Sequence, residues 1–195
     1  MAIKTFSSGE VLSASDTNTY LNNGGLVYIT QALITAGSST AVSFNNCFNA
    51  TYDNYRILID GFQPSVASTG LLMRMRVGGV DAAGASDYFF ADMGLYVNNT
   101  SAAANGNGLS YGSTTIFNAS NTLALGNASL DIFNPFKIER TFWHGNGMLW
   151  NTNYGIRTTG NAHNVVASYD GFTLTTNTVA TITRLRVRVY GYRNA

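Results

Sequence analysis

The strictest constraint on the fold lies near the C-terminus of this 195-residue chain. Residues 181–192 read Thr-Ile-Thr-Arg-Leu-Arg-Val-Arg-Val-Tyr-Gly-Tyr, so that Leu185, Val187 and Val189 alternate with arginines. Successive side chains of a β-strand point to opposite faces, so this pattern predicts a strand with one dry and one solvated face. A slip of one residue would bury the arginines, and the register is therefore strongly specified. The rest of the chain must supply sheet against which this strand packs.

Short strand-like segments, separated by turns rich in Asn, Gly and Ser, follow one another from residue 26 onward. We expect strands at residues 26–33, 40–44, 55–62, 71–77, 88–97, 109–117, 122–125, 129–133, 140–151, 165–168, 171–175 and 181–192. Many short strands with few prolines are typical of a β-sandwich or jelly roll. Crossover helices, which parallel α/β folds need, are missing from the pattern. The sequence therefore predicts an all-β fold, an antiparallel β-sandwich of jelly-roll type, as one domain over residues 26–195.

Residues 1–25 differ from this domain and are expected to form a separate N-terminal segment. Ser13 and Asp16 form a helix-capping pattern, and a run of Asn and Gly after the next few residues supplies a stop. This predicts a short helix of about two to three turns. Such a helix is too weakly apolar to be stable alone, so its apolar residues must pack on the domain or on a partner.

The amino-acid composition excludes some classes of partner but does not identify one. Only 11% of the residues are charged and the net charge is +1, so nothing attracts polyanions and we expect no nucleic-acid partner. A surface of Asn, Ser, Thr and Gly suits a protein that packs against neighbours or meets sugars, and equally any weakly charged extracellular β-protein. Neither a signal peptide nor a membrane-spanning apolar run is found. We expect synthesis in a cytoplasm and no insertion into a membrane.

Reaction chemistry is not visible in the sequence. His144 and His163 have no spacing typical of a metal site or a Ser-His-Asp triad, and we interpret His144 as a strand histidine beside core aromatics. The single cysteine, Cys47, excludes an intramolecular disulfide and a multi-cysteine metal site, and we expect it to be buried. The carboxylates offer no selected pair for glycoside cleavage. The prediction is a non-enzymatic protein with no catalytic residues, no metal and no cofactor.

Two sets of arginines project from single faces of predicted strands. Arg74 and Arg76 form one set, and Arg184, Arg186 and Arg188 form the other. If their strands were neighbours, the arginines would form a basic stripe for phosphates or acidic sugars. Solvated outer faces, or pairing with carboxylates such as Asp60, is the interpretation that the neutral net charge favours. Packing of these faces between subunits is a third alternative.

Two polar segments are candidates for a binding surface. Residues 97–108 carry no bulky side chain after Val97 and are expected to form a long loop, either a flexible tip or a partner-facing surface. The aromatic residues Trp150 and Tyr154 flank a polar turn that contains Asn151 and Asn153. The chain's aromatics fit a core better than a ligand platform, but aromatics beside amides are also a physical means of stacking on a sugar ring.

The leader at residues 6–21, Phe-Ser-Ser-Gly-Glu-Val-Leu-Ser-Ala-Ser-Asp-Thr-Asn-Thr-Tyr-Leu, resembles the opening of many virion proteins of tailed bacteriophages. Those proteins have an aromatic residue, a Gly-Glu-Val-Leu-Thr-Ala-Ala/Ser-Asp core, and then an Asn and a Leu. The matching residues are Gly9, Glu10, Val11, Leu12, Ala14, Asp16, Asn18 and Leu21, with Ser13 in place of the usual Thr. Residues 52–59 and 182–192 are similar, more loosely, to the first and last core strands of β-sandwich modules in phage tail fibres.

The resemblance implies a structural protein of the virion, commonly trimeric, whose leader contacts the particle while the sandwich faces outward. Such modules often bind cell-surface glycan, and some decorate the capsid instead. Long fibre proteins continue into coiled or intertwined shafts, a pattern this sequence does not contain.

These observations lead to a tail-associated fibre or receptor-binding module, assembled as a homotrimer on the virion with other virion proteins and facing host cell-surface glycan. The expected particle-anchoring residues are Phe6, Val11, Leu12, Tyr20 and Leu21. The expected receptor or glycan-binding residues are Trp150, Asn151, Asn153 and Tyr154. The alternative is a decoration or cement protein that stabilises the head shell, and a polysaccharide depolymerase is a third hypothesis.

Overall fold

A computed structural model of the chain describes residues 7–11, 13, 25–98, 100–116, 119–122, 126–150 and 154–194. Every regular element within these residues is a β-strand, and every strand pairing is antiparallel. The predicted all-β antiparallel fold is therefore confirmed. The helix expected after Ser13 lies outside the described residues.

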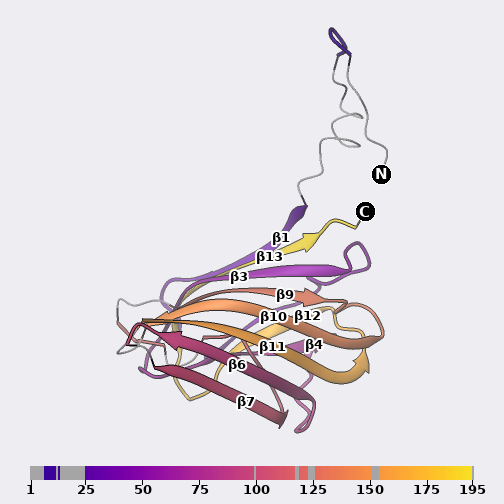
Figure 1. The fold of residues 1–195 in the computed structure, drawn as a ribbon. Helices are drawn as coiled ribbons and strands as arrows, with labels where there is room; N and C mark the ends of the chain where they lie inside the picture. The colour runs from indigo at the N-terminus through magenta and orange to yellow at the C-terminus, as the bar shows by residue number, and fades with distance from the viewer. Residues whose placement is uncertain are drawn as a thin grey trace.

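The strands form two sheets (Figure 1). The eight-stranded sheet has the spatial order β1 (Leu26–Ile34), β13 (Ile182–Tyr192), β3 (Asn54–Pro64), β9 (Gly126–Phe133), β10 (Glu139–Trp150), β11 (Tyr154–Ala167), β6 (Tyr88–Tyr96) and β7 (Ser101–Leu109). The smaller sheet has the order β2 (Ala41–Phe44), β12 (Gly171–Thr176), β4 (Leu71–Val77) and β5 (Val80–Asp81), with β8 (Gly112–Ser113) also paired to β4. Within the described chain, β1 and β7 are thus the free edges of the larger sheet.

The hydrophobic core lies between the two sheets. Phe48 joins them, because its ring centroid is 4.6 Å from that of Tyr55 in β3 and 5.7 Å from that of Phe172 in β12. The larger sheet contributes the buried side chains of Tyr55, Ile57, Ile59, Leu130, Ile132, Leu185, Val187 and Val189, and the smaller sheet those of Leu71, Met73, Met75, Phe172 and Leu174. Burial of this one continuous cluster is what holds the two layers together.

The register predicted for β13 is confirmed. Leu185, Val187 and Val189 are fully buried, whereas Arg186 and Arg188 lie on the outer face of the sheet. β13 lies between β1 and β3, and Arg186 pairs in register with Asp60 of β3. The strand therefore fixes its neighbours on both sides while its dry face sets the core.

The prediction of a long loop at residues 97–108 is wrong, because most of this segment forms β7. This strand pairs with β6, with Met93 opposite Ala103 and Leu95 opposite Ser101. Ala, Asn and Gly have low strand propensity, but pairing with a neighbouring strand overrides such local preferences.

Other strand boundaries also differ from those predicted. β11 begins at Tyr154, well before the expected residue 165, and within residues 110–116 only β8 is formed. Most of the strand expected at residues 122–125 lies outside the described residues.

Leu185 offers a direct test of the role of β13 in the core. Leu185→Ala should lower the free energy of unfolding by about 2–5 kcal/mol, because it removes buried methyl groups and leaves a cavity. Urea unfolding followed by circular dichroism measures this. The neighbouring variant Arg184→Ala, on the exposed side of the strand, should change the same quantity by less than about 0.5 kcal/mol. Equal losses in the two variants would contradict the assigned register.

Candidate functional site

The predicted anchoring residues fall mainly outside the described structure. Val11 is described and is 85% exposed. It follows a tight turn in which the Glu10 N–H donates to the Ser7 carbonyl at 3.0 Å, and Gly9 has the positive φ of 86° that such a turn requires. Phe6, Leu12, Tyr20 and Leu21 lie outside the described residues. Anchoring by this segment therefore stays a prediction.

Two of the predicted glycan-binding residues, Trp150 and Tyr154, lie where β10 ends and β11 begins. Trp150 is the last residue of β10 and pairs in register with Tyr154, the first residue of β11. The two aromatic positions are thus directly opposite each other on adjacent strands. Asn151 and Asn153, which lie between them in sequence, are outside the described residues. The structure brings the two aromatic positions together, and their role in binding stays a prediction.

The two arginine sets do not form a common stripe. Arg74 and Arg76 belong to the smaller sheet, whereas Arg184, Arg186 and Arg188 belong to the larger one.

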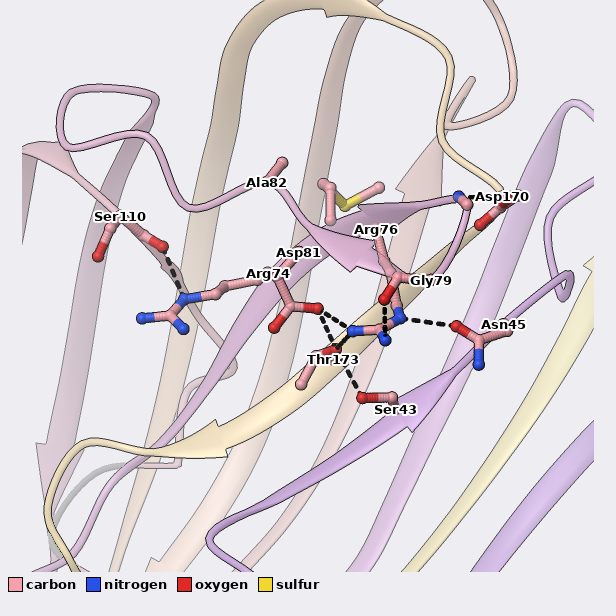
Figure 2. Close-up of polar contacts among 12 residues, drawn as sticks. Ser43, Asn45, Arg74, Arg76, Gly79, Asp81, Ala82, Ser110, Asp170 and Thr173 are labelled. Carbon is pink, nitrogen blue, oxygen red and sulfur yellow. Dashed lines mark hydrogen bonds and ion pairs between the residues drawn. The ribbon is translucent and has the colours of Figure 1, made fainter.

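Arg76 is held by partners on the outer face of the smaller sheet, as Figure 2 shows. It pairs with Asp81 and donates to Asn45 Oδ1 at 2.6 Å and to Thr173 Oγ1 at 3.1 Å. Arg74 points away from this group and donates to the Ser110 carbonyl at 2.9 Å (Figure 2). On the larger sheet, Arg186 and Asp60 are 3.9 Å apart. Pairing with carboxylates, the interpretation favoured from the sequence, is therefore confirmed for Arg76 and Arg186.

The two histidines occupy opposite faces of the larger sheet. His144 is exposed, beside Phe133 at a centroid distance of 5.4 Å. His163 is fully buried between Tyr88 and Tyr169, and the Tyr169 hydroxyl lies 3.1 Å from its Nδ1 atom. In the part of the chain that the structure describes, no three His, Cys, Asp or Glu residues are grouped to hold a metal ion.

Cys47 is fully buried, as predicted from the sequence. Burial raises the pKa of its thiol to about 12. The thiolate, which is the reactive form, is therefore scarce at neutral pH.

The most distinctive surface is a largely apolar groove on the outer face of the larger sheet, which runs from Arg188 of β13 and Asp60 of β3 over β9, β10, β11 and β6 to Ser101 of β7. Four large apolar side chains are exposed there: Met93 (66%), Leu95 (54%), Met148 (58%) and Ile156 (59%). Met148 is opposite Ile156, and Ile156 is opposite Leu95, so three of them lie side by side on neighbouring strands. Contiguous exposed apolar area of this kind marks an interaction surface more often than isolated exposed residues do.

Polar residues form a second row beside these side chains. Ser129, Asn146 and Thr158 follow one another in register on β9, β10 and β11, and all three line the groove, whose volume is about 870 Å³. A second hollow of about 640 Å³ continues over β11, β6 and β7. The groove can therefore take an extended, mainly apolar ligand or segment, with hydroxyl and amide groups along one side.

The opposite face of the same strands is polar. Asp92 and Arg157 point inward and are 4% and 6% exposed, with the Arg157 Nη2 atom 3.9 Å from Asp92 Oδ2. The Ser113 hydroxyl donates to Asp92 Oδ2 at 2.8 Å, and the Ser113 N–H donates to Asn161 Oδ1 at 2.7 Å. Burial raises the pKa of Asp92, while hydrogen bonds from Thr159 and Ser113 and the charge of Arg157 oppose that rise. At this end of the sheet, charge is inside and aliphatic side chains are outside.

Sequence reasoning missed the groove because alternation does not say which face is dry. Residues 92–95 of β6 alternate as Asp-Met-Gly-Leu, which without a structure predicts that Met93 and Leu95 are buried. The sequence did carry one signal, because Ile156 and Arg157 alternate in the same way as the residues of β6. Pairing β6 with β11 places Asp92 and Arg157, which have opposite charges, on one face of the sheet.

Comparison of the chain with protein-family models, with curated proteins and with solved structures finds no match. Among the described residues, no helix has the length and hydrophobicity needed to cross a bilayer.

Breaking the buried Asp92–Arg157 pair should destabilise the fold far more than breaking an exposed pair with the same separation between its charged atoms. Asp92→Ala should lower the free energy of unfolding by about 3 kcal/mol, because it removes the carboxylate that balances the buried charge of Arg157. The control is Asp60→Ala, whose pair with Arg186 also spans 3.9 Å but is largely exposed, and which should cost less than about 1 kcal/mol. Urea unfolding measures both, and equal losses would refute the buried placement.

His163 should make stability depend on pH. Burial lowers the pKa of His163 in the folded protein, against smaller opposing effects of the Asp87 charge and a hydrogen bond to the Val165 backbone. The unfolded chain therefore takes up a proton first, near its ordinary pKa of about 6.5. Stability is fully present above that pH and should fall as the pH drops below it, by up to about 1.4 kcal/mol per pH unit.

Urea unfolding between pH 7.5 and pH 5.5 (roughly one unit on either side of the unfolded pKa) measures this slope. His163→Gln should flatten it, whereas His144→Gln should leave it as in the wild type. A wild-type slope retained in His163→Gln would show that another group is responsible.

Proposed function

We propose that this chain is a non-enzymatic structural protein of a tailed-bacteriophage virion, acting as a tail-associated fibre or receptor-binding module and assembled as a homotrimer. The observation that carries the proposal is the leader, in which Gly9, Glu10, Val11 and Leu12 match the opening of such proteins and Asp16 follows at the same spacing. The exposure of Val11 supports a role for this segment in contacting another protein rather than its own core.

The fold supports the same proposal. Two antiparallel sheets enclose a single core cluster, which is the arrangement of a β-sandwich, and we assign the domain to the jelly-roll type. Strands far apart in sequence are neighbours in the sheets, as with β13 between β1 and β3 and β12 between β2 and β4. Such crossing connections are typical of Greek-key and jelly-roll topologies rather than of simple meanders.

The β10–β11 hairpin is the proposed recognition element. It pairs the Trp150 and Tyr154 positions in register, and residues 151–153 between them in sequence read Asn-Thr-Asn. Aromatic rings next to amide groups suit the apolar face and hydroxyl groups of a sugar. The weakly charged composition of the chain suits neutral glycan on a host cell surface rather than a polyanion.

The proposal predicts where the protein lies on the particle. Gold-labelled antibody against it, viewed on intact virions by electron microscopy, should mark the tail or its fibres. Gold over the head would instead support the alternative role of a decoration protein that stabilises the shell. Virions without label would overturn both roles.

The proposal also predicts that the hairpin aromatics are needed for host binding. Purified protein should compete with phage adsorption, and Trp150→Ala or Tyr154→Ala should raise the concentration required at least about tenfold, because central aromatic residues dominate such contacts. Phe142→Ala is the matched control, since Phe142 is an exposed aromatic residue on the same strand, and it should compete like the wild type. Equal competition by all four proteins would exclude the hairpin as the receptor site.

A further inference from the structure

We propose that the groove on the outer face of the larger sheet binds a long-chain fatty acid, with the carboxylate at Arg188 and the hydrocarbon chain over Met148, Ile156 and Leu95. Three properties of the groove favour this ligand: its narrow width, the change in polarity along its length, and an arginine without a charged partner. The site is separate from the proposed recognition element and does not depend on the virion role.

The groove runs across the strands between two rows of outward-facing side chains. One row is Leu95, Ile156 and Met148, which are opposite one another on β6, β11 and β10. The residues between the rows either point inward or lack a side chain, as with the buried Arg157 and with Gly147. The floor of the groove is therefore bare backbone. The other row, two residues away along each strand, consists of Met93, Thr158, Asn146, Ser129, Leu58 and Arg188.

The width of the groove favours a thin ligand. Residues two apart on a strand are separated by roughly 7 Å, whereas an α-helix with its side chains is about 10–12 Å across. An extended peptide is thin enough, but part of its N–H and C=O groups would lie against Leu95, Ile156 and Met148, whose side chains cannot bond them. A hydrocarbon chain is thin and has no polar groups to satisfy, so it meets both conditions.

Polarity changes from one end of the groove to the other. The end over β10, β11 and β6 holds the four exposed apolar side chains, whereas Arg188 and Asp60 line the end over β13 and β3. Asp60 is 3.9 Å from Arg186. The Arg188 guanidinium, in contrast, has no hydrogen bond or ion pair with any residue that the structure describes. An unpaired positive charge at the end of an apolar groove is complementary to an apolar chain with an anionic head.

The length of the groove matches a single acyl chain. The hydrocarbon core of a bilayer is about 30 Å thick and holds two chains end to end, so one chain spans about 15 Å. Three strand spacings, from β9 to β6, span about 14 Å, and β13 lies two spacings, or about 10 Å, beyond β9. The carboxylate head and the long side chain of Arg188 together bridge that last part. Met93 and Met148 add flexible thioether side chains, which adapt to the shape of a ligand.

NMR of the protein labelled with ¹³C at the methionine methyl groups tests the site directly. The chain has five methionines, of which Met93 and Met148 line the groove while Met73 and Met75 are buried in the core. Titration with laurate should shift the signals of Met93 and Met148 in a saturable way and leave those of Met73 and Met75 in place. A ligand of this size should have a Kd of about 1 mM or tighter. Met93→Leu and Met148→Leu assign the two signals.

The length and the charge of the ligand should both affect binding. Decanoate has two fewer CH₂ groups and should bind about tenfold more weakly than laurate, because less apolar surface leaves water. Dodecyltrimethylammonium has an alkyl chain of similar length with a positive head, and should bind at least about tenfold more weakly because it cannot pair with Arg188. Equal shifts of the Met93 and Met148 signals by all three compounds would overturn the proposed orientation.

Variants of the two ends of the groove complete the test. Arg188→Gln should weaken laurate binding about tenfold, whereas Arg184→Gln, an exposed position on the same strand outside the groove, should bind laurate like the wild type. Ile156→Asn should also weaken binding about tenfold. Its control is Val166→Asn, because Val166 is equally exposed on the same strand but does not line the groove. Circular dichroism checks that all four variants are folded.

The inference is overturned if laurate leaves the Met93 and Met148 signals in place, or if Arg188→Gln binds laurate as tightly as the wild type. Sedimentation of the ligand-free protein then identifies what the groove does instead. An oligomer with unmoved signals would show that a second copy covers the groove, and a monomer with unmoved signals would show that the groove takes no acyl chain. Shifts of Met73 and Met75 as large as those of Met93 and Met148 would show that laurate loosens the core, which also overturns a site confined to the groove.

Discussion

The rest of the structure depends on how the inward-facing side chains of β13 pack into the core. These side chains are Leu185, Val187 and Val189. β13 lies between β1 and β3 and packs into the core that also receives side chains from β4 and β12 of the smaller sheet. Because arginines occupy the alternate positions, no shifted register can keep a dry face inside. The neighbouring strands therefore inherit their register from this one, and the two sheets have one way to face each other.

At the other end of the larger sheet, charged side chains point inward and aliphatic side chains point outward. There the inward positions of β6 and β11 hold Asp92 and Arg157, and the Ser113 hydroxyl donates a hydrogen bond to the Asp92 carboxylate. A buried pair of charges is tolerated only with good partners. The consequence is an outer face that carries aliphatic side chains, so one local exchange of polar and apolar positions creates the groove.

This division of the sheet connects the fold to the proposed role on a virion. The end around β13 contributes aliphatic side chains to the core, while the end from β10 to β6 exposes Met93, Leu95, Met148 and Ile156 on its outer face. The β10–β11 hairpin carries both Met148 and Ile156, which lie in the groove, and the paired positions Trp150 and Tyr154, which belong to the proposed recognition element.

The sequence by itself determined the all-β class, the dry face of β13, the shared face of Arg74 and Arg76 on β4, and the burial of Cys47, because period-two alternation and residue chemistry are local properties. It did not reveal β7, whose small residues form a strand only when β6 is beside them. It also left open which face of β6 and β11 is dry, since alternation marks two faces without orienting them. Only the tertiary structure decided that orientation, because bringing Asp92 and Arg157 together across two strands distant in sequence is what makes burying them tolerable.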